Sequence, residues 1–154
     1  MPPKDLINAI LVRLRAAYQD DPGASVDIAP LCTKEDINPI EVSNTLRLEG
    51  LIKDDVVFGD GKTQCAITIK GIAALDPASV ENKINQVLAR MGEANSISNV
   101  MSILELDAKD FQFAFDLANE LQNRDLVKLL YAFQPGKVVS VEMTLEGVRK
   151  KAGH

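Results

Sequence analysis

The hexapeptide Ile67-Thr68-Ile69-Lys70-Gly71-Ile72 recurs later in this chain as Met143-Thr144-Leu145-Glu146-Gly147-Val148. Two further pairs keep nearly the same spacing, namely Leu51-Ile52 with Leu126-Val127, and Gly61-Lys62 with Gly136-Lys137. The spacing is 75 or 76 residues in every case. Self-similarity at a nearly fixed period indicates a duplicated structural unit. It predicts two units, over residues 1–76 and 77–154.

The residues ahead of the first hexapeptide carry the end signals of a helix and of a hairpin. Asn38 can cap a helix, Pro39 fits a first helical position, and Gly50 suits the left-handed conformation that ends a helix. Gly59-Asp60-Gly61 is typical of a tight turn between two strands. With the apolar spacing, these signals predict helices over about 4–18, 28–32 and 39–49, and strands over 53–58 and 62–69.

The second half of the sequence repeats this order with one departure. Asp125 stands where the first half has Gly50, and the third helix is longer. The same patterns predict helices over about 84–91, 100–104 and 107–123, a loop over 92–98, and strands over 127–133 and 137–145 joined through Gln134-Pro135-Gly136. The fold class we expect is therefore α+β, mostly α with small β-hairpins.

The stretch Leu48-Glu49-Gly50-Leu51-Ile52, followed by Ile67-Thr68-Ile69-Lys70-Gly71, resembles the winged-helix (winged helix-turn-helix) family. The resemblance implies tandem winged-helix-like units, in which the third helix is a potential recognition helix and the hairpin is the wing. It extends over nearly the whole chain if both units count. A single α+β domain with two unrelated hairpins is the competing interpretation.

The charge of the chain argues against broad contact with nucleic acid. The formal net charge is −5, whereas nonspecific DNA binding depends on clustered positive side chains that neutralise phosphates. The first unit nevertheless offers possible DNA contacts, with Asn44 and Arg47 on its third helix and Lys53 and Lys62 on its hairpin. A DNA-binding transcriptional regulator that uses the first unit is therefore the alternative function.

Three phenylalanines alternate along the predicted third helix of the second unit: Phe111, Phe113 and Phe115. At ~100° per residue they span about 400° of helix rotation, so all three cannot face one core. At least one is expected to pack against the other unit, a second copy of the chain or a protein partner. With the acidic third helices, they favour our main prediction, a non-enzymatic protein-interaction or assembly module of a larger complex.

No set of side chains in the sequence predicts catalysis. His154, the last residue, is the only histidine, so a serine or cysteine nucleophile has no evident base. Phosphate-binding glycine loops are absent from the sequence, and Cys32 and Cys65 lack the spacing of a zinc site. We therefore expect no enzyme activity, catalytic residue, metal, cofactor or small-molecule ligand.

The expected surroundings of the chain follow from its hydropathy and termini. No stretch approaches the ~20 apolar residues of a membrane span, and the N-terminus does not resemble a signal peptide. We expect a cytoplasmic location without membrane contact. The expected partner is a protein or a second copy of the chain, with nucleic acid as the alternative partner of the first unit.

Overall fold

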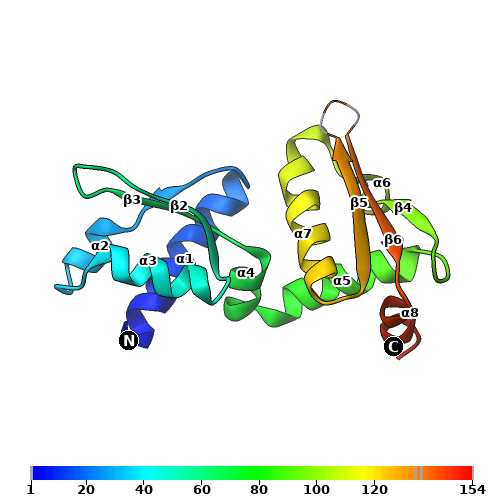
Figure 1. Ribbon diagram of the computed structural model, residues 1–154, viewed down its shortest axis with the longest axis horizontal. Coiled ribbons are helices and arrows are strands. Elements are labelled where there is room, and N and C mark those ends of the chain that lie inside the picture. Colours follow the sequence, from blue (N-terminus) through cyan, green and yellow to red (C-terminus); the bar gives the residue numbers. More distant parts are fainter. Residues whose placement is uncertain (1, 134, 136, 154) are drawn as a thin grey trace. The chain divides into compact units, whose positions relative to one another are not determined.

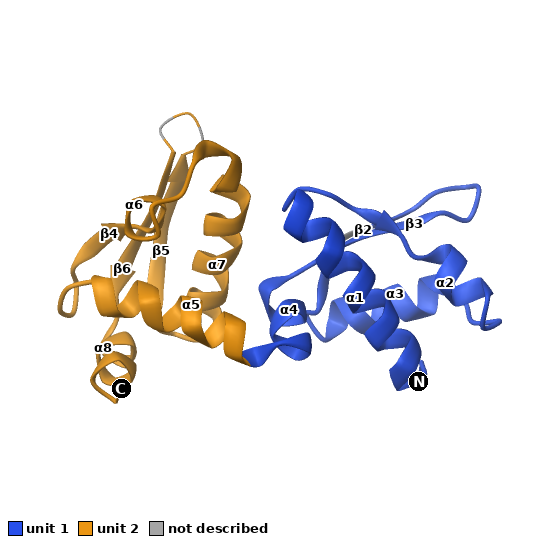
Figure 2. Ribbon diagram, turned by 180° about the vertical axis from the view of Figure 1, so that it is seen from behind, with its two compact units in different colours: residues 1–77 blue, residues 78–154 orange. Residues whose placement is uncertain are grey.

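The computed structural model describes residues 2–133, 135 and 137–153, except for the side chain of Asp54. His154 and the expected turn residues Gln134 and Gly136 lie outside the described residues. The chain forms two compact units, Met1–Pro77 and Ala78–His154, which Figure 2 distinguishes by colour.

Unit 1 packs its helices against a small antiparallel sheet with the strand order β1-β3-β2 (Figure 1). The first helix buries side chains at the spacing of three and four residues that its sequence shows, and Ile10 and Leu14 lie at its centre. The elements are α1 (Lys4–Asp20), β1 (Val26–Asp27), α2 (Ala29–Thr33), α3 (Pro39–Leu48), β2 (Ile52–Val57), β3 (Thr63–Ile67) and α4 (Ile69–Leu75).

Unit 2 has the same kind of sheet, with the strand order β4-β6-β5, and its core is built in the same way. Ile84 and Leu88 of its first helix, and Leu117 and Leu121 of the helix that precedes its hairpin, are almost completely buried. The elements are α5 (Pro77–Arg90), β4 (Ile97–Asn99), α6 (Val100–Ile103), the 3-10 helix η1 (Ala108–Asp110), α7 (Phe111–Asn123), β5 (Val127–Phe133), β6 (Val138–Met143) and α8 (Leu145–Ala152).

The predicted fold class is confirmed. The structure is α+β, with 54% helix, 19% strand and only small antiparallel sheets, so helices dominate as expected. No helix among the described residues has both the length and the apolar character needed to cross a membrane.

Some predicted element boundaries were wrong. The strands expected to reach residues 69 and 145 end at Ile67 and Met143, because the next residue, a threonine in each case, already caps a helix. The expected loop over 92–98 contains the start of β4, which pairs with β6. A three-residue strand is too short to show an alternating pattern, so the sequence alone does not reveal it.

The threonine of the repeated hexapeptide makes two hydrogen bonds with its side-chain hydroxyl. The Oγ1 of Thr68 accepts the backbone N–H of Gly71 at 3.0 Å and donates to the carbonyl oxygen of Gly50 at 2.6 Å. Thr144 makes the equivalent bonds in unit 2, at 3.0 and 2.7 Å. The threonine thus caps the last helix of its unit and joins it to the C-terminal end of α3 in unit 1 or α7 in unit 2.

The glycine of the hexapeptide is needed because the backbone passes very close to it. A Cβ on Gly71 would overlap the carbonyl oxygen of Leu51, and a Cβ on Gly147 would overlap that of Leu126. Neither glycine has the positive φ that favours glycine for conformational reasons. The repeat is therefore explained by local packing, which holds a short helix against the chain segment that leaves the preceding helix.

The departure at Asp125 is tolerated because its backbone keeps the geometry of Gly50. Gly50 has φ +75° and Asp125 has φ +61°, so both lie in the left-handed region. Both helices end with the same pair of backbone hydrogen bonds, in which the left-handed residue donates to the carbonyl three residues back and the next residue donates to the carbonyl five back.

Exchanging these two residues tests that geometry. Asp125→Gly is expected to stabilise unit 2 by about 0.5 kcal/mol, because relief of left-handed strain exceeds the added entropy of the unfolded chain. The reverse change, Gly50→Asp, is expected to destabilise unit 1 by about 1 kcal/mol. Urea denaturation followed by circular dichroism measures both changes. Destabilisation by Asp125→Gly would contradict the proposed source of strain.

Candidate functional site

Three cations of unit 1 lie where α3 ends and where β2 and α4 begin. We call Arg47, Gly50, Lys53 and Lys70 the cationic corner. The side chain of Lys70 runs over Gly50, since a Cβ built on that glycine would lie 3.4 Å from Lys70 Cδ and 3.7 Å from its Nζ. Lys70 is exposed and has no ion-pair partner among the described residues. Its ammonium group is therefore available to an anion.

Arg47 is partly neutralised inside unit 1. Its Nε lies 3.3 Å from Oδ2 of Asp55, and its NH2 donates to Oδ1 of Asn44 at 3.4 Å. The arginine side chain is 49% exposed, so its guanidinium group is open to solvent, whereas the aspartate side chain is only 16% exposed. Because a guanidinium group has five N–H donors, an incoming anion can bind its exposed side while the contact with Asp55 is kept.

The residues predicted to contact DNA do not form one unpaired basic face. Asn44 and Arg47 lie together on α3, as just described, but Lys62 lies beside the hairpin turn with its Nζ 3.9 Å from Oδ2 of Asp60. Lys53 is half-buried at the start of β2 and also has an interaction partner. Two of the three cations in this set are therefore ion-paired with carboxylates of their own unit.

Lys70 is the residue of this site that the sequence analysis missed. It lies in the repeated hexapeptide, where the second copy has Glu146. The exchange of a lysine for a glutamate inside an otherwise similar hexapeptide was the signal that could have identified it. Residues that keep a fold are expected to match between the two copies, whereas an inverted charge indicates that the two positions have different surroundings or tasks.

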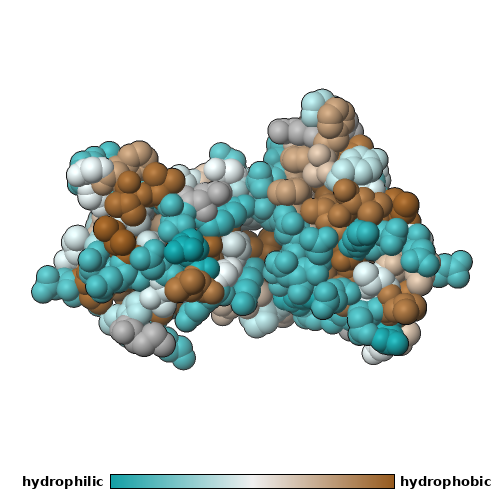
Figure 3. Space-filling model, in the orientation of Figure 1, coloured by the Kyte–Doolittle hydropathy of each residue, from teal (hydrophilic) through white to brown (hydrophobic). Residues whose placement is uncertain are grey.

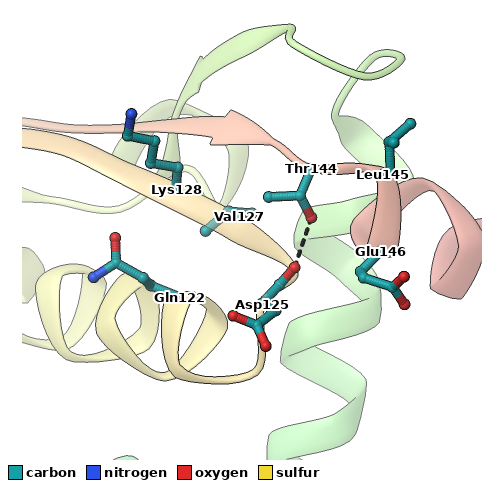
Figure 4. Close-up of a pocket in the computed structure, with 7 residues that line it drawn as sticks. All are labelled: Gln122, Asp125, Val127, Lys128, Thr144, Leu145 and Glu146. Atoms are coloured by element: carbon teal, nitrogen blue, oxygen red, sulfur yellow. Dashed lines mark hydrogen bonds between the residues drawn. The ribbon is translucent and has the colours of Figure 1, made fainter.

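The counterpart of the cationic corner in unit 2 is a surface hollow of about 450 Å³, shown in Figure 4. Gln122 stands in the place of Arg47 there, and its Oε1 accepts the backbone N–H of Leu129 at 2.8 Å. The dashed line in Figure 4 is the bond from the Thr144 hydroxyl to the Asp125 carbonyl oxygen. The hollow is lined by Gln122, Asp125, Val127, Lys128, Thr144, Leu145 and Glu146. It lacks the surplus of positive charge that distinguishes unit 1.

The three phenylalanines predicted to form a protein interface are all half-buried on α7. The rings of Phe111 and Phe115 stack with their centroids 6.4 Å apart and their planes within 4°. Phe113 is also half-buried, so none of the three is part of the fully buried core of unit 2. Their role as an interface stays a prediction.

The two cysteines are unsuited to nucleophilic chemistry. Cys32 and Cys65 are free and completely buried in unit 1. Burial raises the pKa of the Cys65 thiol to about 12, and burial also raises the pKa of Cys32. Both thiols are therefore protonated at neutral pH, and the thiolate is the reactive form. Among the described residues no group of three or more metal-binding side chains comes together.

Comparison with known protein families gives one result. A family described as the AMP-binding enzyme C-terminal domain matches residues 27–108. The matched segment begins in β1 and ends in η1, and it contains the whole cationic corner. The phenylalanines of α7 and the hollow of Figure 4 lie outside it. No curated protein and no solved structure matches the chain.

This match corrects the functional part of the sequence analysis. The winged-helix assignment was wrong, because the matching family is that of an enzyme domain and not a winged-helix family. The family match also contradicts the two predicted functions, which were a non-enzymatic assembly module and, as the alternative, a DNA-binding regulator. The expectation that the chain has no link to enzyme activity was also wrong.

The physical reason for this error lies in the features that carried the resemblance. The threonine and glycine of the hexapeptide satisfy a helix cap and a close backbone approach, and Gly50 ends a helix. Any chain that packs a short helix beside a hairpin can meet the same local demands. Such features therefore describe a way of packing and carry no information about a ligand.

Proposed function

Since the chain belongs to the AMP-binding enzyme C-terminal domain family, we propose that it acts as the C-terminal part of an adenylate-forming enzyme. The observation that carries this proposal is the family match over residues 27–108. In this role the chain supplies charged groups to a nucleotide, while another part of the enzyme holds the base and the group that is adenylated.

The cationic corner is the part of the matched segment best suited to an adenylate. The phosphate of AMP carries about two negative charges near neutral pH, and lysine and arginine are the side chains that neutralise phosphate. Lys70 is exposed and has no ion-pair partner in the part of the chain that is described. Arg47 is about half exposed and can donate to a phosphate oxygen in addition to its contact with Asp55. We therefore assign the first phosphate contact to Lys70 and the second to Arg47.

The proposed contact predicts weak binding of AMP that depends on its phosphate. One or two exposed charge-assisted contacts support a dissociation constant of about 1 mM, and adenosine, which lacks the phosphate, should not bind measurably. Lys70→Gln is expected to weaken AMP binding about fivefold, and added salt should weaken it further. Isothermal titration calorimetry on the full chain measures these affinities.

Lys128→Gln is the matched control for this experiment. Lys128 is an exposed lysine on β5 without an ion-pair partner among the described residues, and it lies outside the matched segment. Its replacement removes the same charge and should leave AMP affinity unchanged. Equal weakening by the two variants, or equal affinity for AMP and adenosine, would show that the cationic corner is not the phosphate site.

A further inference from the structure

β5 is an edge strand of the unit 2 sheet, since the strand order is β4-β6-β5. Its seven residues contain one charged side chain, Lys128, and neither proline nor glycine. The exposed fractions are 36% for Leu130, 58% for Tyr131 and 57% for Phe133. Figure 3 shows apolar surface gathered over this part of unit 2. An uncharged, apolar strand at a sheet edge is a template for pairing with another strand.

Unit 1 provides an internal comparison, because β2 holds the same edge position in its own sheet. Both edge strands are bulged at matching places, between Lys53 and Val56 in β2 and between Leu129 and Tyr131 in β5. The bulge of β2 carries Asp54 and Asp55, whereas the equivalent positions of β5 carry Leu129 and Leu130. Charged residues at an edge discourage pairing. Unit 1 thus has a charged bulge, and unit 2 has an apolar one.

The first half of the β5 edge is covered within unit 2. The backbone N–H of Leu129 donates to Oε1 of Gln122, which belongs to α7. Beyond the bulge, Tyr131–Phe133 pair with β6 on one side, and none of the described residues hydrogen-bonds their other side. The residues with unpaired backbone groups at this edge therefore include the two most exposed aromatic side chains, Tyr131 and Phe133.

We propose that this segment, Leu130–Phe133, is a self-association surface that pairs antiparallel with the same segment of a second copy of the chain. A second copy presents the same uncharged edge to this one, and the position of Lys128 sets the direction of pairing. In an antiparallel pair of β5 strands the two Lys128 side chains lie at opposite ends of the paired segment. Each lysine is then beside the uncharged end of the other strand. In a parallel pair they would lie side by side and repel each other.

The available area predicts a weak dimer. Burying the exposed parts of Leu130, Tyr131 and Phe133 in both copies removes roughly 600 Å² of surface. Stable interfaces bury at least about 1,200 Å², so contacts between the two main chains must supply much of the remaining buried area. Association should therefore require a high protein concentration. The surface lies outside the matched residues 27–108, so this inference does not depend on the proposed nucleotide function.

Sedimentation velocity of the full chain from about 10 µM to about 1 mM tests the proposal. The wild type is expected to shift from monomer towards dimer over this range. Tyr131→Arg places a charge on the surface and should weaken association at least tenfold. Val56→Arg is the matched control, since Val56 is 49% exposed at the equivalent position of β2, and it should behave as the wild type. Circular dichroism establishes that both variants fold.

Hydrogen exchange of the wild-type chain provides a second readout that needs no variant. Those amides of Tyr131–Phe133 that face away from β6 are expected to exchange more slowly as the protein concentration rises. A chain that stays monomeric at about 1 mM would overturn the proposal. A dimer that persists in folded Tyr131→Arg, or that forms without added protection of β5, would assign association to a different surface and would overturn it as well.

Discussion

Gly147→Ala is expected to destabilise unit 2 by about 3 kcal/mol, the largest effect that we predict for a single methyl group. The added Cβ would overlap the carbonyl oxygen of Leu126 and would come within 2.6 Å of the Met143 sulfur. A backbone carbonyl cannot turn aside as a flexible side chain can, so α8 must move away from the strand. Alanine is favoured over glycine within helices by about 1 kcal/mol, so helix propensity acts in the opposite direction. Urea denaturation followed by circular dichroism measures the loss.

Gly153→Ala is the control for this substitution. Gly153 follows α8 in the same unit, and a Cβ there would meet only ordinary contacts at 3.5 and 3.6 Å. Its replacement should change stability by less than about 0.5 kcal/mol. Gly71→Ala should reproduce the large effect in unit 1, because its Cβ would overlap the carbonyl oxygen of Leu51. If Gly147→Ala were as stable as Gly153→Ala, the close approach could not explain the repeated glycine.

Arg124→Met is expected to cost unit 2 about 2 kcal/mol. Arg124 Nε lies 2.8 Å from Glu120 Oε2 and its NH1 lies 2.9 Å from Glu81 Oε2. Glu120 is only 9% exposed, so its carboxylate would be left in the protein interior without this partner. Methionine retains most of the packing of the aliphatic part of the arginine. The decrease in the free energy of unfolding therefore comes mainly from removal of the charge. Denaturation at neutral pH measures it.

Denaturation at acidic pH tests whether the stability lost in Arg124→Met is electrostatic in origin. The hydrogen bond from Lys150 is the largest cause that lowers the pKa of Glu81 below its ordinary value of 4.5, and Arg124 adds to the effect. A lowered pKa stabilises the fold above pH 4.5 and ceases to do so as the pH falls through the folded-state pKa. The difference between wild type and Arg124→Met should therefore narrow on acidification. A difference that stays constant from neutral pH to pH 3 would point to lost packing instead.

The sequence predicted the helices and hairpins well because their end signals are local. The Asn38 side chain accepts the N–H of Ile40, and Gly50 adopts the left-handed conformation, as the sequence indicated. Asp125 takes the same conformation, but its side chain gives only a weak signal for it. β4 depends entirely on its pairing with β6, a contact more than 40 residues away along the chain that no local pattern contains.

The candidate site was harder to predict than the fold. Arg47 and Lys53 were identified from the sequence as DNA contacts, and the proposed nucleotide site uses the same cations, since basic side chains suit DNA phosphates and nucleotide phosphates equally well. Lys70 was missed because the capping and packing of its hexapeptide accounted for every other feature of that stretch. Its position over Gly50 depends on the fold of the whole unit and cannot be derived from spacing along the chain.

A nuclear magnetic resonance titration of the full chain with AMP is the decisive test of the cationic corner as a phosphate site. We expect the amide signals of residues 47–53 and 68–71 to move as AMP is added, and adenosine at the same concentration to leave them in place. Movement confined to unit 2, or equal movement with adenosine, would contradict a phosphate site at the cationic corner.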